Sequence, residues 1–383
     1  MKRIYMDYNA TTPVLPEVVD AMRPYFCQKY GNEESLHQFG NEAKEALESA
    51  REKIASILKA NPEEIYFTSC ATESSNTVIK GVAFANWDKK GKIITTPIEH
   101  SAVLAPVRWL EKYGFEIVYL PVDNTGLVNP DDLRNAIDDK TLLISIMWAN
   151  NEVGTIEPIE ELVSIAKEKG VPFLTDAVQV AGKMDIDLVE LPADFLTLSA
   201  HKFYGPKGVG LLFARKGKRF EPLILGGGHE RKKRSGTVNV AGAVGMAKAL
   251  EIVTKQMDTE SKRLSKLTDS LIDGVLDRIP IAQLNGHRTK RIPNTANISF
   301  KGIEGESVLM GLDMAGIAVS SGSACSSADL TVSHVLKAMN VDLVAAQGAV
   351  RFSLGKYNTA EDIDYLLETL PNVVDRLKSF SAL

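Results

Sequence analysis

The sequence predicts an α/β protein with a large domain, built on a mostly parallel, mixed sheet flanked by helices, and a smaller α+β domain at its C-terminal end. Two observations predict this fold class. From residue 59 to about residue 250, short apolar runs alternate with amphipathic stretches, which is typical of a parallel sheet covered by helices on both faces. From about residue 255 onward, one long amphipathic segment is followed by short strands and a closing helix.

The large domain is expected to span residues 13–254. Six runs rich in Ile, Val, Leu and Phe predict buried strands at 63–69, 91–97, 115–122, 141–150, 171–178 and 194–200. Amphipathic helices are expected between them at 101–114 and 158–170, and the second closes on a glycine, as helices often do. A seventh strand, at 207–217, is expected to run antiparallel.

The smaller domain is expected to comprise residues 255–383 together with residues 1–12, which do not follow the alternation of the large domain. A helix over 258–279 places five apolar residues on one face; they are Leu264, Leu267, Leu271, Val275 and Ile279. Short strands are predicted at 294–300, 317–320 and 349–354. A closing helix over 359–380 begins with a capping pattern.

Composition excludes several classes of partner. The 383 residues carry a formal net charge of -5, which gives no electrostatic reason to expect nucleic acid or an anionic membrane. No apolar run approaches the ~20 residues that span a bilayer, and no apolar segment follows the basic N-terminal residues as in a signal peptide. The three cysteines, Cys27, Cys70 and Cys325, are few, odd in number and far apart. We therefore expect a cytoplasmic protein with free thiols and no resident metal.

Lys202 is the first candidate for chemistry. It comes just after the predicted strand at 194–200, in DFLTLSAHKFYGPKGVG, where a parallel sheet exposes the edge at which α/β proteins bind ligands. The glycines that follow let the backbone turn tightly and approach a bound group. A single lysine at a strand end is more often simply solvated, so its interpretation depends on the residues at neighbouring strand ends.

Asp176 and Gln179 close the preceding strand, in VPFLTDAVQ. An acid at this place could stay ionised against the protonated pyridine nitrogen of pyridoxal phosphate, which needs such a partner to accept electrons. Capping the start of a following helix is an equally good explanation for the aspartate.

Three further strand ends carry polar residues. Small hydroxyl residues in IYFTSCATESSN, with Thr72 among them, begin a helix whose free N–H groups suit a phosphate, although ordinary capping explains them equally well. His100 could stack on a flat ring or transfer a proton, or could be a structural histidine. Asn150 and Asn151 could bind a ligand or simply form a turn. Together the five strand ends describe an anionic, aromatic, aldehyde-bearing cofactor, so we predict pyridoxal 5'-phosphate on a Lys202 Schiff base.

At the level of motifs, the chain resembles the cysteine desulfurases of the NifS/IscS type, in the class V branch of the fold-type I pyridoxal-phosphate enzymes. The resemblance runs nearly end to end and is carried, in order, by YMDYNATTPV, FTSCATESSN, PIEHSAVL, NNEVGTIEPI, TDAVQVAGK, SAHKFYGPKGVG, GGGHERKKRSGT and SSGSACSS. It implies the fold-type I transferase fold, a homodimer, and pyridoxal-phosphate-dependent removal of sulfur from L-cysteine to give L-alanine.

The resemblance also implies roles for individual residues. Lys202 would carry the cofactor, and Asp176 would pair with its pyridine nitrogen. Gln179 would contact the ring hydroxyl. His100 would stack on the ring as a catalytic residue, and Asn151 would lie near substrate and ring. The phosphate would be held by residues of one subunit and by one residue of the other subunit: Ala71, Thr72, Ser199 and His201, joined by Thr237 from the partner.

Arg351 and Cys325 would act on the substrate. Arg351, in VRFSLG, would bind the substrate carboxylate, for which a guanidinium fork is suited. Cys325, on a Ser-, Gly- and Ala-rich loop at about 319–330, would take the sulfur as a persulfide, because a thiolate attacks sulfur readily. The persulfide would then pass to an acceptor protein such as an iron–sulfur scaffold. Whether Cys325 also serves as a transient cluster ligand is left open.

Three features depart from the family pattern. Cys70 stands where the family usually has glycine, so it could alter packing of the phosphate loop or supply a second thiol. Glu33 and Glu34 replace the more usual Pro-Ser. From the ending RLKSFSAL we expect the chain to lack the longer C-terminal extension that some IscS-type members use to dock a scaffold protein, which favours the NifS-like end of the family.

Other functions remain as alternatives at this point. A selenocysteine lyase or a class V aminotransferase would keep the cofactor and change the chemistry, and a transaminase would not need Cys325. A non-catalytic sulfur carrier or iron–sulfur scaffold would not need the residues around Lys202. The short basic stretch HERKKRSG is weak support for nucleic-acid binding in an acidic chain.

Overall fold

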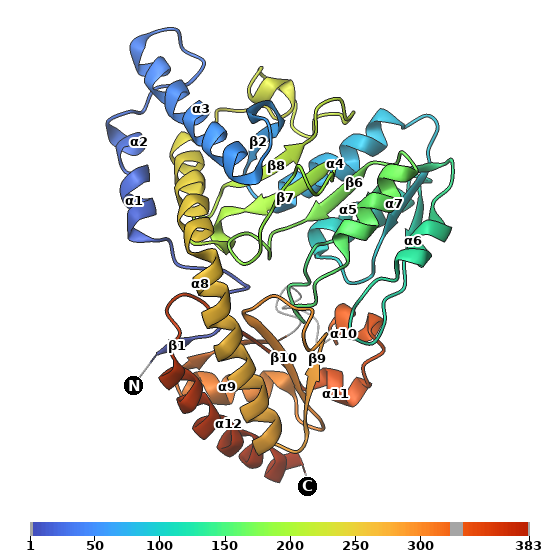
Figure 1. Cartoon of the computed structure of the whole chain (residues 1–383), viewed down its shortest axis with the longest axis vertical. Coiled ribbons are helices and arrows are strands. Elements are labelled where there is room, and N and C mark those ends of the chain that lie inside the picture. The colour runs from blue at the N-terminus through green and yellow to red at the C-terminus, as the bar shows by residue number, and fades with distance from the viewer. Residues whose placement is uncertain (1–2, 322–331, 382–383) are drawn as a thin grey trace.

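The computed structural model describes residues 3–321 and 332–381. A seven-stranded sheet has the strand order β2-β8-β7-β6-β5-β3-β4 (Figure 1). β8 runs antiparallel to both of its neighbours, whereas the pairs from β7 to β4 are parallel. The strands are β2 (Ile65–Thr68), β3 (Lys92–Thr95), β4 (Glu116–Tyr119), β5 (Thr141–Ser145), β6 (Phe173–Asp176), β7 (Phe195–Ser199) and β8 (Gly210–Ala214).

The predicted fold class is confirmed. Each of the seven segments expected to form a strand contains one strand of this sheet, and the seventh runs antiparallel as predicted. The strands are shorter than the apolar runs that predicted them, because the runs continue past the last ladder pair into the loops at the carboxyl edge.

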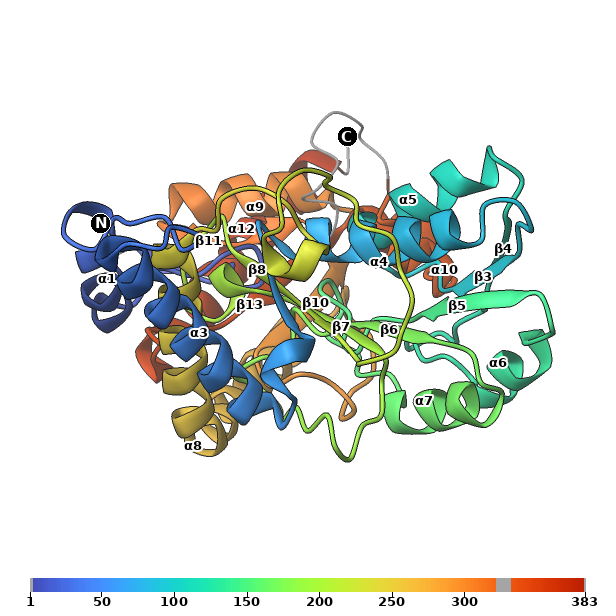
Figure 2. The ribbon, with the colours of Figure 1, turned by 90° about the horizontal axis from the view of Figure 1, so that it is seen from above.

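Both faces of the large sheet are buried. Successive strand residues enter different cores: Ile93 packs with helices α4 (Ala71–Ala85) and α5 (Ser101–Glu111), whereas Ile94 packs in the core that also holds residues of α3 (Gln38–Leu58) and α7 (Ile159–Glu168). This explains the continuous apolar runs, because neighbouring residues on a strand point to opposite faces. Figure 2 shows the sheet between these two helix layers.

Shorter helices complete the part of the chain around the large sheet. They are α1 (Pro16–Met22), α2 (Pro24–Cys27) and α6 (Pro130–Ala136), with the 3₁₀ turns η1 (Pro62–Glu64), η2 (Ala200–Lys202) and η3 (Glu230–Lys232).

Helix α8 (Val240–Arg278) joins the two parts of the molecule (Figure 1). At 1.5 Å per residue its 39 residues extend about 58 Å. Its first half buries Ala243, Met246 and Leu250 in the core of the large sheet, and its second half buries Leu264 and Leu271 in a separate core. The helix expected at 258–279 is therefore the second half of a longer one. The expected boundary near residue 255 falls inside α8, and the division into domains stays a prediction.

A four-stranded antiparallel sheet with the order β12-β13-β10-β9 organises the C-terminal part. Its strands are β9 (Ala282–Asn285), β10 (Thr295–Phe300), β12 (Ser320–Ser321) and β13 (Ala349–Ser353). Its helices are α9 (Gly305–Met314), α10 (His334–Ala338), α11 (Leu343–Gln347) and α12 (Ala360–Ser381). The N-terminal strand β1 (Ile4–Tyr5) pairs in parallel with β11 (Ile317–Ala318).

Two local expectations for this part were incomplete. The single strand expected at 317–320 is divided between β11 and β12, which belong to different sheets. Strand β9 was not expected, because Ala-Gln-Leu-Asn is short and half polar and carries a weak strand signal. In the part of the chain that is described, no helix combines the length and the apolar character needed to cross a bilayer.

Glu157 gives this fold a testable pH dependence. Its Oε2 accepts a hydrogen bond from Val128 N at 2.9 Å, and its buried Oε1 has no partner among the described residues. Burial raises the pKa of Glu157 from 4.5 to about 8. Between these two values the folded state binds a proton that the unfolded chain has lost, so stability falls as the pH rises through this window.

We predict that Glu157→Gln, which resembles the protonated acid, becomes more stable relative to the unchanged protein between about pH 5 and about pH 8.5. Urea unfolding at the two pH values measures the change. Glu168→Gln is the control, because that carboxylate is exposed and pairs with Arg134. A stability difference for Glu157→Gln that is the same at both pH values would contradict the prediction.

Candidate active site

A cavity of about 500 Å³ lies at the carboxyl edge of the large sheet, where residues of the C-terminal part also reach it. Of the residues predicted from the sequence for cofactor and substrate, the cavity is lined by Ala71, Thr72, His100, Asn151, Asp176, Gln179, Ser199, His201, Lys202 and Arg351. Two predicted residues are not among them. Thr237 is exposed outside this cavity, and Cys325 lies outside the described residues.

Lys202 is placed by the end of β7. The strand stops at Ser199, and Lys202 is the last residue of the turn η2 that follows it at the carboxyl edge. Its Nζ donates to the carbonyls of Asn9 and Ala10 at 2.5 and 2.9 Å. The amine is therefore held in the cavity by the N-terminal segment rather than extending into solvent.

Asp176 is the last residue of β6 and is buried. Its Oδ1 accepts from Val178 N at 2.9 Å, and a turn follows instead of a helix, so it does not cap a helix. Burial raises the pKa of Asp176, and the positive charges of His100 and Lys202 oppose this rise. A buried carboxyl group among positive charges can bind a protonated ring nitrogen.

His100 begins helix α5, and its Nδ1 accepts from Ala102 N at 3.1 Å. Burial lowers the pKa of His100, which favours a neutral imidazole whose proton is on Nε2. The histidine thus caps a helix and also lines the cavity.

The start of helix α4 forms another wall of the cavity, at Ala71 and Thr72. Cys70 is the N-cap residue and provides no side-chain hydrogen bond, so it leaves the first-turn N–H groups for a ligand. A helix N-terminus with unsatisfied N–H groups attracts anions. The backbone at Cys70 is extended, with φ of -174°, a conformation that any residue adopts, so the cysteine is accommodated without strain.

His201 and Ser199 lie near this helix start in the cavity lining. His201 Nδ1 is 3.1 Å from Thr11 Oγ1. Burial and the charges of Lys202 and Lys207 lower the pKa of His201 to about 4. The imidazole is therefore neutral near pH 7 and acts as a hydrogen-bonding group there.

Gln179 is held from two sides. Lys183 Nζ donates to the Gln179 carbonyl and to Oε1, at 3.0 and 3.2 Å, and Gln179 Nε2 donates to Asn9 O at 3.2 Å. The Gln179 Nε2 carries two N–H groups, and only one of them is needed for the bond to Asn9 O. The second N–H can therefore donate to a ligand. Burial lowers the pKa of Lys183 to about 7.

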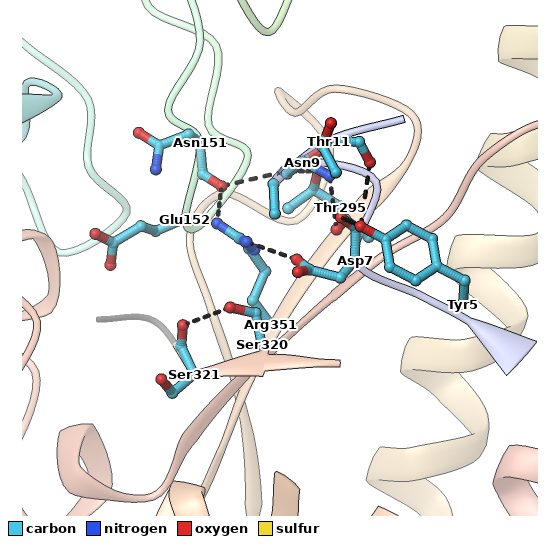
Figure 3. Close-up of polar contacts among 12 residues, drawn as sticks. Tyr5, Asp7, Asn9, Thr11, Asn151, Glu152, Thr295, Ser320, Ser321 and Arg351 are labelled. Atoms are coloured by element: carbon cyan, nitrogen blue, oxygen red, sulfur yellow. Dashed lines mark hydrogen bonds and ion pairs between the residues drawn. The ribbon is translucent and has the colours of Figure 1, made fainter. Parts of the chain in front are cut away.

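Arg351 lies on β13 at the side of the cavity that the C-terminal part supplies (Figure 3). Its Nη2 pairs with Asp7 Oδ1 at 2.8 Å, and its Nη1 donates to Asn151 O at 3.1 Å. Asn150 has a different role: its side chain binds Ile98 O and the backbone N–H groups of the following turn. Of the two asparagines, Asn150 is thus the turn former and Asn151 faces the cavity.

Several further lining residues were not singled out from the sequence, among them Asn9, Ala10, Glu152, Ser333 and His334. The first three lie inside motifs that carried the resemblance, so proximity to those motifs was the available signal. Ser333 caps helix α10 and donates to buried Glu152, while His334 Nε2 donates to Glu99 O at 3.0 Å. These contacts join segments far apart in sequence.

Glu33 and Glu34, which depart from the family pattern, face His229. Glu33 is buried, and its Oε1 lies 2.9 Å from His229 Nδ1. Glu33 Oε1 also accepts from Val238 N at 3.3 Å, so the substitution ties this part of the N-terminal chain to the segment that carries Thr237.

The residues present fit pyridoxal 5'-phosphate. One cavity offers a lysine amine for the aldehyde and a buried carboxyl group for the ring nitrogen, and it offers a helix start with hydroxyl groups for the phosphate dianion. This is the donor set that the chemistry of the group requires. Within the described ranges, no cluster of three or more His, Cys, Asp or Glu residues could hold a metal ion.

Comparison with known proteins points to one family. Residues 4–366 match the family described as Aminotransferase class-V. A cysteine desulfurase IscS from Dictyoglomus turgidum is 54% identical over 382 residues, covering 100% of this chain and 97% of that one. A solved NifS-like protein has a TM-score of 0.93 at 44% identity, covering 98% of this chain and 100% of its own. A solved SspA in complex with cysteine has a TM-score of 0.83 at 35% identity, covering 94% and 100%.

Gly210 allows β8 to lie against the start of α4, and it provides a test of this wall of the cavity. A Cβ at Gly210 would lie 2.6 Å from Cys70 Cα and 2.9 Å from Ala71 N. Gly210 also pairs with Thr68 and Ser199 on its two neighbouring strands. A side chain here must therefore move backbone that forms the cavity.

We predict that Gly210→Ala weakens binding of pyridoxal 5'-phosphate at least about fivefold, since overpacking of this kind costs about 1–3 kcal/mol and 1.4 kcal/mol is a factor of ten. Absorbance titration of the cofactor-free protein measures the affinity, and thermal melting of the same sample shows whether the fold survives. A folded variant with unchanged affinity would show that this wall does not hold the cofactor.

Proposed function

The chain belongs to the aminotransferase class-V family, and we propose that the cavity at the carboxyl edge of its large sheet is its active site. The enzyme is a cysteine desulfurase: it uses pyridoxal 5'-phosphate to remove sulfur from L-cysteine and releases L-alanine. One observation supports the assignment of the site most strongly. Lys202, Asp176 and Arg351, which the reaction needs for cofactor attachment, ring electronics and substrate recognition, line a single cavity.

Pyridoxal phosphate, when bound, accepts the electron pair released at the substrate Cα. Lys202 would hold it through the aldehyde carbon, and Asp176 would bind the ring nitrogen. His100 would lie against the ring, and Gln179 would donate to the ring hydroxyl. The phosphate would be held at the start of α4 by Ala71 and Thr72, together with Ser199 and His201.

Lys202 is also the group we assign to proton transfer at the substrate Cα. Its Nζ stays within reach of the cavity when it is not bonded to the cofactor, because the carbonyls of Asn9 and Ala10 bind it. A lysine held at one place can remove a proton and return it without leaving the site.

The substrate carboxylate is assigned to Arg351, with Asn151 beside it. Arg351 is 4% exposed and lines the cavity, so a carboxylate bound there would be shielded from water. A guanidinium binds carboxylates in a planar, charge-assisted geometry. L-cysteine is the substrate, in agreement with the cysteine bound in the solved SspA complex.

We assign transfer of the sulfur to Cys325, which lies outside the described residues. The described chain on either side leads to the cavity: Ser320 pairs with Arg351 on one side, and Val332 and Ser333 line the cavity on the other. The Cys325 thiolate would attack the substrate sulfur, forming an S–S bond as the substrate Cβ–S bond breaks. The products balance as one enzyme persulfide and one alanine: one of the two thiol protons completes the alanine methyl group, and the other belongs to the persulfide.

Two further proposals concern the protein that accepts this persulfide and the oligomeric state of the enzyme. We propose that the sulfur passes to an acceptor protein such as a scaffold for iron–sulfur cluster assembly, because a persulfide is a form of sulfur that a second thiolate can take up. A cytoplasmic location fits the few scattered cysteines. Service of Cys325 as a transient cluster ligand stays a hypothesis.

A homodimer is proposed from Thr237 and from an exposed apolar surface. Thr237 is exposed and lies outside the cavity of its own chain, so it would complete the phosphate site of a second copy. The chain near it is held by the buried ion pair between Arg51 and Glu230, at 2.7 Å, and by that between Glu73 and Arg234, at 2.9 Å. Large apolar side chains are exposed along the N-terminal helices and beside this segment: Phe26, Tyr30, Leu36, Phe39 and Leu225. Apolar surface of this kind is typical of subunit interfaces.

We predict that Cys325→Ala binds the cofactor normally but loses release of L-alanine from L-cysteine, because no thiolate remains to take the sulfur. Alanine is measured by chromatography, and cofactor binding by absorbance. Cys27→Ala is the control, since that exposed cysteine is outside the cavity. Alanine release that persists in Cys325→Ala would contradict the persulfide mechanism and favour an aminotransferase or lyase.

We predict that the holoenzyme sediments at twice the chain mass of 41.8 kDa. In the same two measurements, Thr237→Ala should weaken cofactor binding and leave the mass of the dimer unchanged. Sedimentation and cofactor titration measure the two effects. A monomer that binds the cofactor at full affinity would contradict the shared phosphate site.

A further inference from the structure

Asp7 has been given no function so far, although its carboxylate contacts Arg351. It belongs to YMDYNATTPV, a motif that carried the family resemblance without any assigned residue. The ion pair joins residues 344 positions apart, and it lies on the side of the cavity assigned to the substrate carboxylate. Its effect on Arg351 can be followed contact by contact.

The orientation of the Arg351 guanidinium depends on two hydrogen bonds among the described residues. Nη2 donates to Asp7 Oδ1 at 2.8 Å, and Nη1 donates to Asn151 O at 3.1 Å (Figure 3). Nε is buried and makes no hydrogen bond to a described residue, so it does not help to fix the group. A guanidinium has five N–H donors, and donors therefore remain for a ligand.

Asp7 is itself held rigidly beside Arg351. It forms a parallel bridge with Ser353, two residues beyond Arg351 on β13. On either side of Asp7, Ser353 N donates to Met6 O at 2.8 Å and Tyr8 N donates to Ser353 O at 3.1 Å. Tyr5 Oη donates to the Asp7 carbonyl at 2.9 Å. The carboxylate therefore approaches the guanidinium from a backbone that cannot shift independently of β13.

Glu152 is the other acid near Arg351, and it does not take the place of Asp7. Figure 3 shows the Glu152 side chain turned away from Arg351, whereas Asp7 faces it. Glu152 instead accepts a hydrogen bond from Ser333. Burial raises the pKa of Glu152, which favours its neutral form. Asp7 is thus the acid that pairs with the guanidinium.

We propose that Asp7 is a positioning residue for substrate recognition: it holds the Arg351 guanidinium so that the remaining N–H donors receive the α-carboxylate of the amino acid. The inference rests on the proposed function, in which Arg351 binds that carboxylate. Without the negative charge of Asp7, only hydrogen bonds to neutral oxygens would fix the guanidinium. Binding of the substrate carboxylate would then include the entropic cost of ordering the Arg351 guanidinium.

The test is the kinetics of Asp7→Asn with L-cysteine. We expect KM to rise at least tenfold while kcat stays within about twofold, because binding is lost equally before and during the reaction. Cysteamine, which has the amine and thiol of cysteine but no carboxylate, should inhibit the variant and the unchanged enzyme at equal concentrations. Asp7→Glu should recover part of the loss, because it restores the negative charge.

Asp269→Asn is a matched control. Asp269 Oδ1 binds Nη2 of the partly buried Arg291 at 2.7 Å, and Arg291 Nη1 donates to Thr295 O at 3.3 Å, so the contacts resemble those of Arg351. Asp269 and Arg291 are outside the cavity. KM in this control should be unchanged. In the double variant Asp7→Asn/Arg351→Lys, KM should rise no further than in Arg351→Lys alone, because both changes act on one contact.

The outcomes separate the proposals. A KM that is unchanged or lower in Asp7→Asn overturns the role of Asp7, and a lower value would mean that Asp7 competes with the substrate. Three other results would also overturn it. Cysteamine inhibition could weaken in Asp7→Asn as much as KM for L-cysteine rises, or KM could rise in Asp269→Asn as much as in Asp7→Asn. The third is a KM in the double variant that is the product of the two separate effects. If the unchanged enzyme releases no alanine from L-cysteine, the proposed function fails instead.

Discussion

Hydrogen bonds from Thr12 N and Oγ1 to His201 O, at 2.9 and 3.0 Å, fix the N-terminal segment at the end of β7. When Lys202 is not bonded to the cofactor, its Nζ also donates to the carbonyls of Asn9 and Ala10 in this segment. Other parts of the site depend on this placement. The carbonyl of Asn9 also accepts from Gln179, and the Asn9 side chain binds Asn151 O, so one residue connects three walls of the cavity. The segment begins in a two-stranded sheet beside the C-terminal core and ends at the carboxyl edge of the large sheet. The segment therefore fixes the position of the cavity residues of the C-terminal part relative to those at the edge of the large sheet.

The charges of the cavity are arranged so that a bound anion or ring cation finds a partner. Burial favours neutral imidazoles at His100 and His201, whose pKa values are lowered, so hydrogen bonding rather than net charge dominates near them. Burial raises the pKa of Asp176, and the positive charge of Lys202 opposes this rise. At the other end, the charge of Arg351 is balanced by Asp7. A dianionic phosphate, a cationic ring nitrogen and a substrate carboxylate thus each meet a separate part of the cavity.

The sequence predicted the features that depend on local pattern. Strand ends followed by polar residues located Lys202, Asp176 and His100, because carboxyl ends of parallel strands meet at one edge. The continuous course of α8 was not predicted, since its buried face changes from small residues against one core to leucines against another. The Asp7 to Arg351 pair was also missed: it joins distant segments through tertiary packing and leaves no local periodicity. Thr237 is exposed, so its assignment to the phosphate site requires the position of a second copy of the chain. A single sequence does not give that position.

In the proposed reaction, sulfur leaves L-cysteine for Cys325 while Lys202 and Arg351 act in one cavity. The most direct test is mass spectrometry of the peptide containing Cys325 after the holoenzyme has reacted with L-cysteine and been trapped with an alkylating reagent. We expect this peptide, and not those of Cys27 or Cys70, to gain the mass of one sulfur atom in step with alanine release. Alanine release with Cys325 unmodified, or with the sulfur on Cys70, would contradict it.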